Sequence, residues 1–411
     1  MRSVLFSLLM LSSTAQAADW LAIQGTEPDD PDKSRLRAAG FVQISAEAFL
    51  ARPVEGLTGD LEPYNGQIAA FNKVPGADGT AKITLRRVRA GFRGVIPETD
   101  GRISTNVAVE LGQNPLTTSA DGWRPRLMDA SVTLAGPAGT ALRVGQFKLP
   151  LADESLEAFH LTTDLVRFSP VAGRLLMERD TVGGRINGFR DVGAQAFGSH
   201  LVQKTEVSWA GMVSNGTVEL GRVEPGVDLT GRVQVARLFD SPRRSPFRDE
   251  LAAYAWATSG MRRVDEDTTF RRTRAGGGLQ LRHSGVRART ELVVADGMID
   301  LGVSPPFKGG TRVTAGEGTA WGLTGLVSKR FAGTWEVGLA GSHLDSMPKG
   351  GAQRRIFDDV TWFGQYHVSK HAWFDLNLAW RTGRAPDGSD NVDRILDTMG
   401  PYGAVMVTVV R

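Results

Sequence analysis

The chain has 411 residues, no cysteine and a formal net charge of +3 at pH 7, and 41% of its residues are hydrophobic. Without cysteine it has neither disulfides nor a thiolate metal site, and so small a net charge argues against a nucleic-acid partner. Its 48 basic residues comprise 39 arginines and 9 lysines. This bias points to oxyanion partners, because a guanidinium donates two parallel hydrogen bonds, although a GC-rich genome produces the same bias.

The first residues are typical of a secretory signal peptide. Arg2 precedes an apolar run over 4–11 and a small-residue site at Ala15–Ala17, which predicts a cleaved segment of 1–17. The run is shorter than the roughly 20 residues of a membrane-spanning helix, and no later run reaches that length. An exported chain of this kind is soluble or a β-barrel. The polar stretch over 18–37 predicts a periplasmic leader.

From residue 38 onward, apolar and polar residues alternate with a period of two. In 102–111, for example, Ile103 and Val107 share one face, while Arg102 and Glu110 lie on the other. This pattern predicts strands that present one face to lipid and one to water. Sixteen such segments occur, at 38–50, 82–93, 102–111, 126–135, 141–148, 191–200, 205–214, 229–239, 250–259, 273–283, 286–295, 319–331, 334–344, 357–368, 372–382 and 402–411.

The connections between these segments supply a second test. Long connections alternate with short ones, as in outer-membrane barrels, and exposed aromatic residues near strand ends suit interfacial girdles. The sequence therefore predicts an all-β fold, a transmembrane antiparallel β-barrel of 16 strands over 38–411. Fourteen or eighteen strands are alternatives because two inner turns are long, and a soluble sandwich or propeller is a third reading. The girdle candidates are Trp335, Trp362, Trp373 and Trp380.

Arginines recur on the parity that faces the lumen, the space enclosed by the strands. Arg87, Arg89 and Arg93 form a ladder on the second strand, whereas Arg86 falls on the lipid parity and is expected to reach the headgroups. Such ladders make wide pores favour anions. Alternatively, acidic partners such as Glu110, Asp129, Glu206 and Glu291 neutralise the arginines and stiffen the wall. The further inward candidates are Arg102, Arg143, Arg232, Arg287 and Arg289.

The connection 149–190 is too long for a simple loop and is expected to fold into the lumen as a constriction loop. It contains an amphipathic piece over 153–164 that is expected to be helical. Its candidate gate charges are Arg167, Arg174, Arg179, Arg185 and Arg190, unless they pair with Glu157, Asp164, Glu178 and Asp180.

Two features belong to the predicted outer surface. One arginine cluster is interpreted as holding lipopolysaccharide phosphates, with an anion funnel as the alternative; it comprises Arg262, Arg263, Arg271, Arg272 and Arg274. The segment 387–393 has oxygen ligands reminiscent of a calcium loop, but it has no closing bidentate Glu, so an acidic loop is the favoured reading.

The residues give little sign of catalysis. The six histidines are scattered, no serine stands in a nucleophile elbow, and no motif calls for a metal or cofactor. A barrel enzyme and a surface scaffold that binds lipopolysaccharide or protein therefore stand as alternatives to a pore.

The run LRVGQFKLP over 142–150 resembles the signature that precedes the constriction loop in the phosphate-selective porin O/P family. Further segments follow in that family's order, at 86–94, 128–132, 177–179, 190–193 and 212–216. The resemblance implies a sixteen-stranded, usually homotrimeric barrel whose third loop folds inward and whose basic residues conduct anions. The chain departs from such barrels by ending in Arg411 rather than in an aromatic residue. This difference concerns the efficiency of insertion into the membrane more than the fold.

Together these features predict a Gram-negative outer-membrane porin for passive, anion-preferring diffusion, with no chemical step. The expected partners are small anions, such as phosphate or a similar oxyanion, and outer-membrane lipid with lipopolysaccharide. Replacing Arg87 and Arg89 with Ala is expected to lower anion permeability while leaving folding nearly intact.

Overall fold

The computed structural model describes most of the chain. The described residues are 20–23, 36–75, 79–99, 101–119, 122–157, 165–179, 185–216, 226–239, 248–263 and 267–411. The predicted signal peptide lies outside them, as do most of the predicted leader and the second half of the amphipathic piece.

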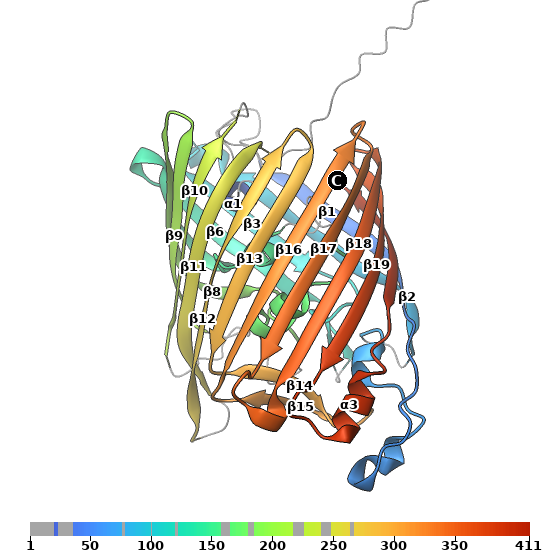
Figure 1. Ribbon diagram of the computed structural model, residues 1–411. Helices are drawn as coiled ribbons and strands as arrows, with labels where there is room; N and C mark the ends of the chain where they lie inside the picture. The colour runs from blue at the N-terminus through green and yellow to red at the C-terminus, as the bar shows by residue number, and fades with distance from the viewer. Residues whose placement is uncertain are drawn as a thin grey trace, which may run out of the picture.

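Sixteen antiparallel strands close into one barrel, with β1 pairing both β2 and β20 (Figure 1). This confirms the predicted fold class and strand count, and every predicted boundary falls within four residues of the observed one. The barrel strands are β1 Arg37–Phe49, β2 Ala81–Val95, β3 Ile103–Glu110, β6 Arg126–Ala135, β7 Thr140–Lys148, β8 Arg190–Val202, β9 Thr205–Ser214, β10 Asp228–Leu238, β11 Glu250–Arg263, β12 Thr269–His283, β13 Val286–Asp296, β16 Thr319–Phe331, β17 Trp335–Ser346, β18 Arg355–Ser369, β19 Ala372–Arg384 and β20 Tyr402–Val410.

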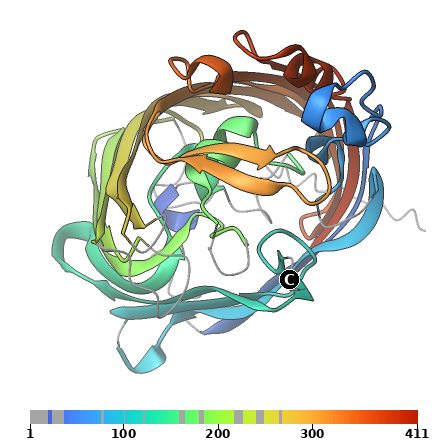
Figure 2. The same cartoon turned by 90° about the horizontal axis from the view of Figure 1, so that it is seen from below.

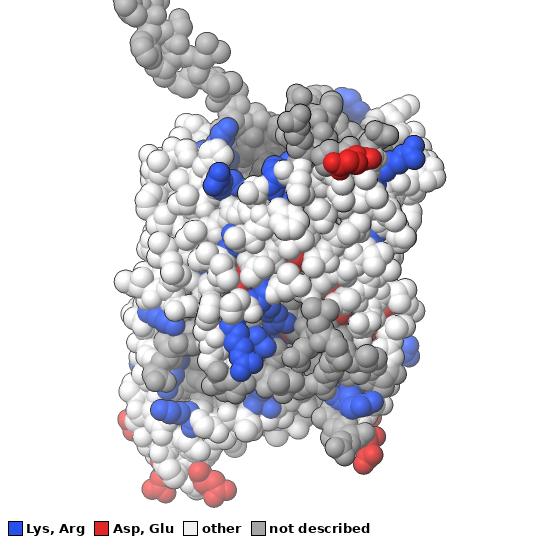
Figure 3. All heavy atoms as spheres, turned by 180° about the vertical axis from the view of Figure 1, so that it is seen from behind, with Lys and Arg blue, Asp and Glu red and all other residues white. Residues whose placement is uncertain are grey.

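The strands separate apolar from polar side chains as the alternation predicts. On β9, Val207 and Trp209 are exposed on the outer face, whereas Glu206 and Ser208 are buried on the inner face. The largest acidic patches on the face seen in Figure 3 lie near its two ends. A barrel with a lipid-facing apolar band has this distribution. No helix among the described residues is long and apolar enough to cross a membrane.

One of the four girdle tryptophans was assigned to the wrong face. Trp335 and Trp380 are exposed on the outer surface, with 52% and 57% of their area accessible. Trp373 is only 6% exposed and shares the inward parity of Asp375, which is also buried. Its position one residue inside the start of β19 does not decide its face; the period of two does.

Short turns join the strands at one end of the barrel, and long connections join them at the other (Figure 1). The turn between β12 and β13 has only Ser284 and Gly285, both with positive φ, as in a type I′ hairpin. The remaining elements are α1 Trp20–Ile23, η2 Gly59–Tyr64, η3 Ala70–Asn72, η4 Pro97–Thr99, β4 Thr118–Ser119, β5 Gly122–Trp123, η5 Pro137–Gly139, α2 Asp153–Leu156, η6 Ala172–Leu176, β14 Ile299–Ser304, β15 Thr311–Ala315, η7 Gly351–Gln353 and α3 Asp390–Leu396.

The segment between β7 and β8 contacts the inner wall on several sides. Leu151, Leu175 and Leu176 belong to one buried apolar cluster with Trp256 of β11 and Phe357 of β18. In the view along the barrel, the green ribbon of this segment runs inside the ring of strands, and the β14–β15 hairpin crosses the opening (Figure 2). Strand walls and inner segment therefore share one core.

Candidate functional site

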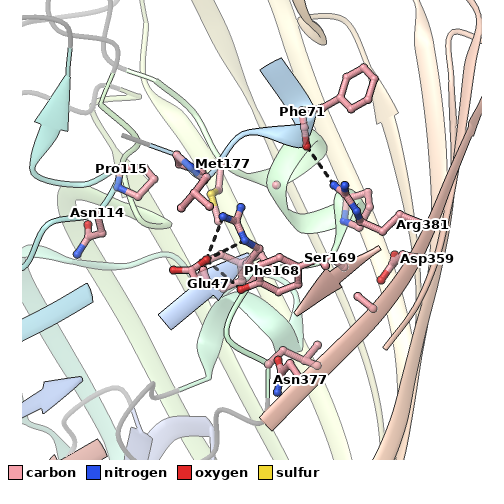
Figure 4. A pocket seen from close by; sticks show the side chains of 18 of the residues that line it. Glu47, Phe71, Asn114, Pro115, Phe168, Ser169, Met177, Asp359, Asn377 and Arg381 are labelled. Carbon is pink, nitrogen blue, oxygen red and sulfur yellow. Dashed lines mark hydrogen bonds and ion pairs between the residues drawn. The ribbon is translucent and has the colours of Figure 1, made fainter. Parts of the chain in front are cut away.

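A cavity of about 360 Å³ lies between the inner segment and the wall formed by β1, β2, β18 and β19. Figure 4 shows part of its lining, with Arg381 and Glu47 on different sides. Its charged lining comprises six arginines and three carboxylates: Arg86, Arg87, Arg167, Arg174, Arg179, Arg381, Glu47, Asp358 and Asp359. Positive charge therefore exceeds negative charge on this wall.

A β-bulge brings Arg86 into the cavity, which corrects the expectation that it reaches the headgroups. The β1–β2 register advances by one residue on β1, from Gln43 to Ile44, but by two on β2, from Arg87 to Leu85. The extra residue is Arg86, which forms an ion pair with Glu47 of β1. Since a bulge changes the parity of the strand, Arg86 and Arg87 both face inward.

Glu47 joins several groups of the cavity wall. Its Oε2 lies 3.0 Å from Arg167 Nη2 and accepts a hydrogen bond of 2.9 Å from the Tyr402 hydroxyl. The Arg167 guanidinium lies 4.8 Å from the ring centroids of both Phe49 and Tyr402. One carboxylate thus serves two arginines, Arg86 and Arg167, and aromatic faces fix the orientation of the second.

Arg381 reaches the cavity from β19 with neutral partners. It donates to the Gly400 carbonyl at 2.7 Å, to Asn72 Oδ1 at 3.0 Å and to the Phe71 carbonyl at 3.2 Å. Its guanidinium lies 4.5 Å from the Phe49 ring centroid. No carboxylate in the described part of the chain forms an ion pair with it. These contacts orient the Arg381 cation and leave its charge without a paired anion.

Arg174 of η6 has still fewer partners. Its guanidinium lies 4.1 Å from the ring centroid of Phe357 on β18. Across the described ranges it makes no hydrogen bond or ion pair, and its side chain is half-buried on the cavity wall. Burial lowers its pKa below the ordinary value, the effect expected when a cation leaves water without a carboxylate in contact.

The other arginines predicted to line a pore on the first half of the barrel lie outside this cavity. Arg89 forms an ion pair of 2.8 Å with Glu110, and Arg143 is buried and donates to Ser131 Oγ at 3.0 Å. Arg93 is half-buried on the inner face of β2, and Arg102 is exposed beside a short turn. Only Arg87 of the predicted ladder lines the cavity.

On the opposite wall, Arg289 forms an ion pair with Glu157 of the inner segment. Arg287, two residues before it on β13, is half-buried on the same face. Arg190, at the start of β8, pairs with Asp129 through Nη2–Oδ2 at 2.9 Å and Nε–Oδ1 at 3.2 Å. Of the other predicted gate charges, Arg179 is exposed on the cavity, whereas Arg185 is half-buried beyond its lining.

Three arginines assigned to the outer surface instead hold the inner segment, so they are not available to lipopolysaccharide. Arg262 contacts Glu178 and Asp228, with Nη2–oxygen distances of 2.8 and 2.6 Å. Arg272 lies 2.9 Å from Glu178, and Arg274 donates to the Leu175 carbonyl at 2.7 Å. Only Arg263 and Arg271 of this cluster are exposed. The physical reason is parity, which turns alternate residues of β11 and β12 inward.

Glu178 is the centre of this attachment. Burial alone would raise the pKa of its carboxyl, but the Arg262 and Arg272 guanidiniums hold it at about 2. A second buried carboxyl on the inner segment, Glu154, accepts hydrogen bonds of 2.7 Å from both the backbone N–H and the hydroxyl of Ser169. Burial raises the pKa of Glu154. Both groups tie the inner segment to itself or to the wall.

The described part of the predicted periplasmic leader contacts the barrel interior. Trp20 of α1 is 1% exposed and donates from Nε1 to Ser208 Oγ of β9 at 2.9 Å. Leu21 is buried in the same cluster as Leu156 of α2 and Phe197 of β8. Trp20 and Leu21 therefore contact the inner face of the barrel.

Among the described residues, no group of three or more His, Asp or Glu side chains has metal-binding geometry. In the segment 387–393, which was compared with a calcium loop, Asp390 is the first residue of α3. Sequence reasoning missed Glu47 and did not assign Arg381 to the site. The alternation of β19 predicts that Arg381 faces inward, but it does not predict that β1, β19 and η6 meet at one cavity.

No protein-family model matches the chain, and no curated protein matches it in sequence. Solved structures do match in fold. An anion-selective porin from Comamonas acidovorans is 13% identical with a TM-score of 0.59, and the match covers 92% of this chain and 99% of that one. The chain has the porin fold.

Two further structures support the same statement. Salmonella typhi OmpF in complex with daunomycin is 12% identical with a TM-score of 0.58, and the match covers 93% of this chain and 99% of that one. The outer-membrane channel DcaP of Acinetobacter baumannii is 12% identical with a TM-score of 0.53 and the same coverage. At these identities the likeness concerns the fold of the barrel.

Proposed function

We propose that this chain is an outer-membrane porin for passive, anion-preferring diffusion of small oxyanions, the class to which phosphate belongs. The excess of arginine over carboxylate on the cavity wall carries this proposal. Guanidinium groups favour anions because charge-assisted hydrogen bonds replace part of their hydration. The apolar outer face of the strands suits lipid, and residues 1–17 would direct export as a cleaved signal peptide.

In this proposal the connection 149–190 is the filter of the pore. Its described residues span the interior: Val166 N–H donates to Asn377 on β19 at 2.8 Å, and the Leu151 carbonyl accepts from Arg232 on β10. Three of its predicted gate charges, Arg167, Arg174 and Arg179, line the cavity. We further propose a homotrimer in the outer membrane; one similar structure, OmpT of Vibrio cholerae, is described as a trimer form.

The decisive experiment is the reversal potential of the full chain in a planar bilayer across a salt gradient. We expect its sign to report chloride as the more permeant ion. A cation-selective or non-conducting protein would contradict the proposal. Replacing Arg87 with Gln should reduce the anion preference, because the substitution removes a positive charge from the cavity lining. The Gln amide keeps a neutral hydrogen-bond donor at that position.

A further inference from the structure

The cavity wall combines cations with a large apolar surface. Phe71, Phe168 and Met177 are half-buried there, on the same cavity as Arg381 (Figure 4). Phe168 and Met177 belong to the inner segment and Phe71 belongs to η3, so none of the three lies on a lipid-facing strand. Further apolar lining residues are Val74, Leu116, Leu165, Ile186 and Met399.

The two arginines without a paired carboxylate, Arg174 and Arg381, supply the polar half of this surface. Each is stacked on an aromatic ring, Phe357 for Arg174 and Phe49 for Arg381. Stacking restricts the plane of each guanidinium. Arg381 already donates from Nε, Nη1 and Nη2 to Gly400, Phe71 and Asn72, so it contributes its positive charge. Arg174 contributes the planar fork of donors that matches a carboxylate. Arg174 has all its donors available among the described contacts.

An inorganic oxyanion would use only half of this site. Phosphate is hydrated on every side, so the apolar wall offers nothing in exchange for the water that it displaces. An organic anion with one charged end and one apolar body satisfies both halves, because its apolar area leaves water as its head group meets the arginines. The cavity volume of about 360 Å³ accommodates such a molecule.

We propose that this cavity binds organic oxyanions with an apolar body, aromatic monocarboxylates being the class that fits, in preference to inorganic phosphate. The inference rests on the proposed porin function and narrows its substrate class. The anionic head lies at Arg174 and Arg381, and the ring lies against Phe71, Phe168 and Met177.

The test compares two carboxylates, one with and one without an aromatic body, and sets both against phosphate. Conductance of the full chain in planar bilayers is measured against concentration for benzoate, acetate and phosphate, with neutral benzamide as a competitor of chloride current. We expect half-saturation by benzoate at a concentration about tenfold lower than that for acetate or phosphate, a difference of about 1.4 kcal/mol. Benzamide should compete weakly because it has no charge for the arginines.

Variants separate the two halves of the site. Phe168→Ser or, should that variant fold poorly, Met177→Ser should remove most of the benzoate advantage and leave acetate unchanged. Phe331→Ser, at an exposed outer position, is the matched control. Arg174→Gln should raise half-saturation for benzoate and acetate alike, whereas Arg263→Gln, at an exposed position outside the cavity, should not.

Equal half-saturation for benzoate and acetate, or tighter saturation by phosphate, would overturn the inference. If the reversal potential still shows anion preference in that case, the porin proposal stands and only the substrate class is wrong. A reversal potential without anion preference instead contradicts the porin proposal itself.

Discussion

Two sets of inward arginines differ in what surrounds them. Arg89, which is half-buried, pairs with Glu110, and Arg190, which is buried, pairs with Asp129, on the wall that contains β2, β3, β6 and β8. Arg381, near the far end of β19, donates to carbonyl and amide oxygens. Within the described part of the chain, Arg174 on η6 lies over an aromatic ring and makes no hydrogen bond or ion pair. The first set cancels its charge and stiffens the wall; the second leaves positive potential in the cavity. An arginine's partners, rather than its presence on the inner face, decide which task it performs.

The largest expected effect is on stability, at the buried pair of Arg190 and Asp129. Arg190→Ala leaves the Asp129 carboxylate buried without its bidentate partner, which should lower the free energy of unfolding by about 3–5 kcal/mol. Denaturant unfolding of the folded protein in detergent measures this. The double variant Arg190→Gln with Asp129→Asn should recover part of the loss, since neither charge remains. A single variant as stable as the parent chain would show that the pair is not stabilising.

The next effect concerns the attachment of the inner segment at Glu178. Because the pKa of Glu178 is lowered from its ordinary value of 4.5 to about 2, its pairing with Arg262 and Arg272 is fully present above pH 4.5 and is lost as the pH falls towards 2. The contribution is about 3 kcal/mol. Protease cleavage within 165–179 should therefore be slow at pH 7 and at pH 5.

Glu178→Gln should make that segment cleavable at pH 7, where the parent chain resists. The matched control is Glu98→Gln, which removes an exposed carboxylate beside a short turn. Equal cleavage of the Glu178→Gln variant and the parent chain would mean that Arg262 and Arg272 do not hold the segment.

A smaller effect distinguishes the two sets of arginines by selectivity. Arg381→Gln removes a charge that no contacting carboxylate compensates, so we expect the anion-to-cation permeability ratio to fall about fivefold, or about 1 kcal/mol. The double variant Arg89→Gln with Glu110→Gln removes a neutral pair outside the cavity and should leave the ratio unchanged. Reversal potentials measure both. If Arg381→Gln and the double variant changed the permeability ratio equally, paired and unpaired arginines would not differ in their effect on selectivity.

The barrel was largely predictable from sequence because each strand carries its own signal. Alternation on β9 alone separates Val207 from Glu206, and sixteen such segments with alternating connection lengths define the closed sheet. Trp373 was assigned to the wrong face, although the alternation places it on the same face as Asp375. The β14–β15 hairpin was missed because its strands are short and lie inside a connection already expected to be long.

The site was less predictable because it depends on pairings between distant residues. The inward position of Arg86 follows from a bulge in the β1–β2 register, and a single strand's alternation carries no information about its partner's register. Glu178 meets Arg262 only because the inner segment crosses to β11. Alternation predicted which arginines face inward; it could not predict which of them find a carboxylate.

The smallest expected effect is at the exposed pair of Arg384 and Asp358, where the charges lie 2.9 Å apart but the Arg384 side chain is 62% exposed. Water already solvates both groups, so Arg384→Ala should change the free energy of unfolding by less than about 1 kcal/mol. Asp358 also retains its contact of 2.6 Å with His343 Nδ1. Denaturant unfolding of Arg384→Ala and Arg190→Ala under the same conditions compares the two pairs. If Arg384→Ala lowered the free energy of unfolding as much as Arg190→Ala does, burial would not explain the different strengths of the two pairs.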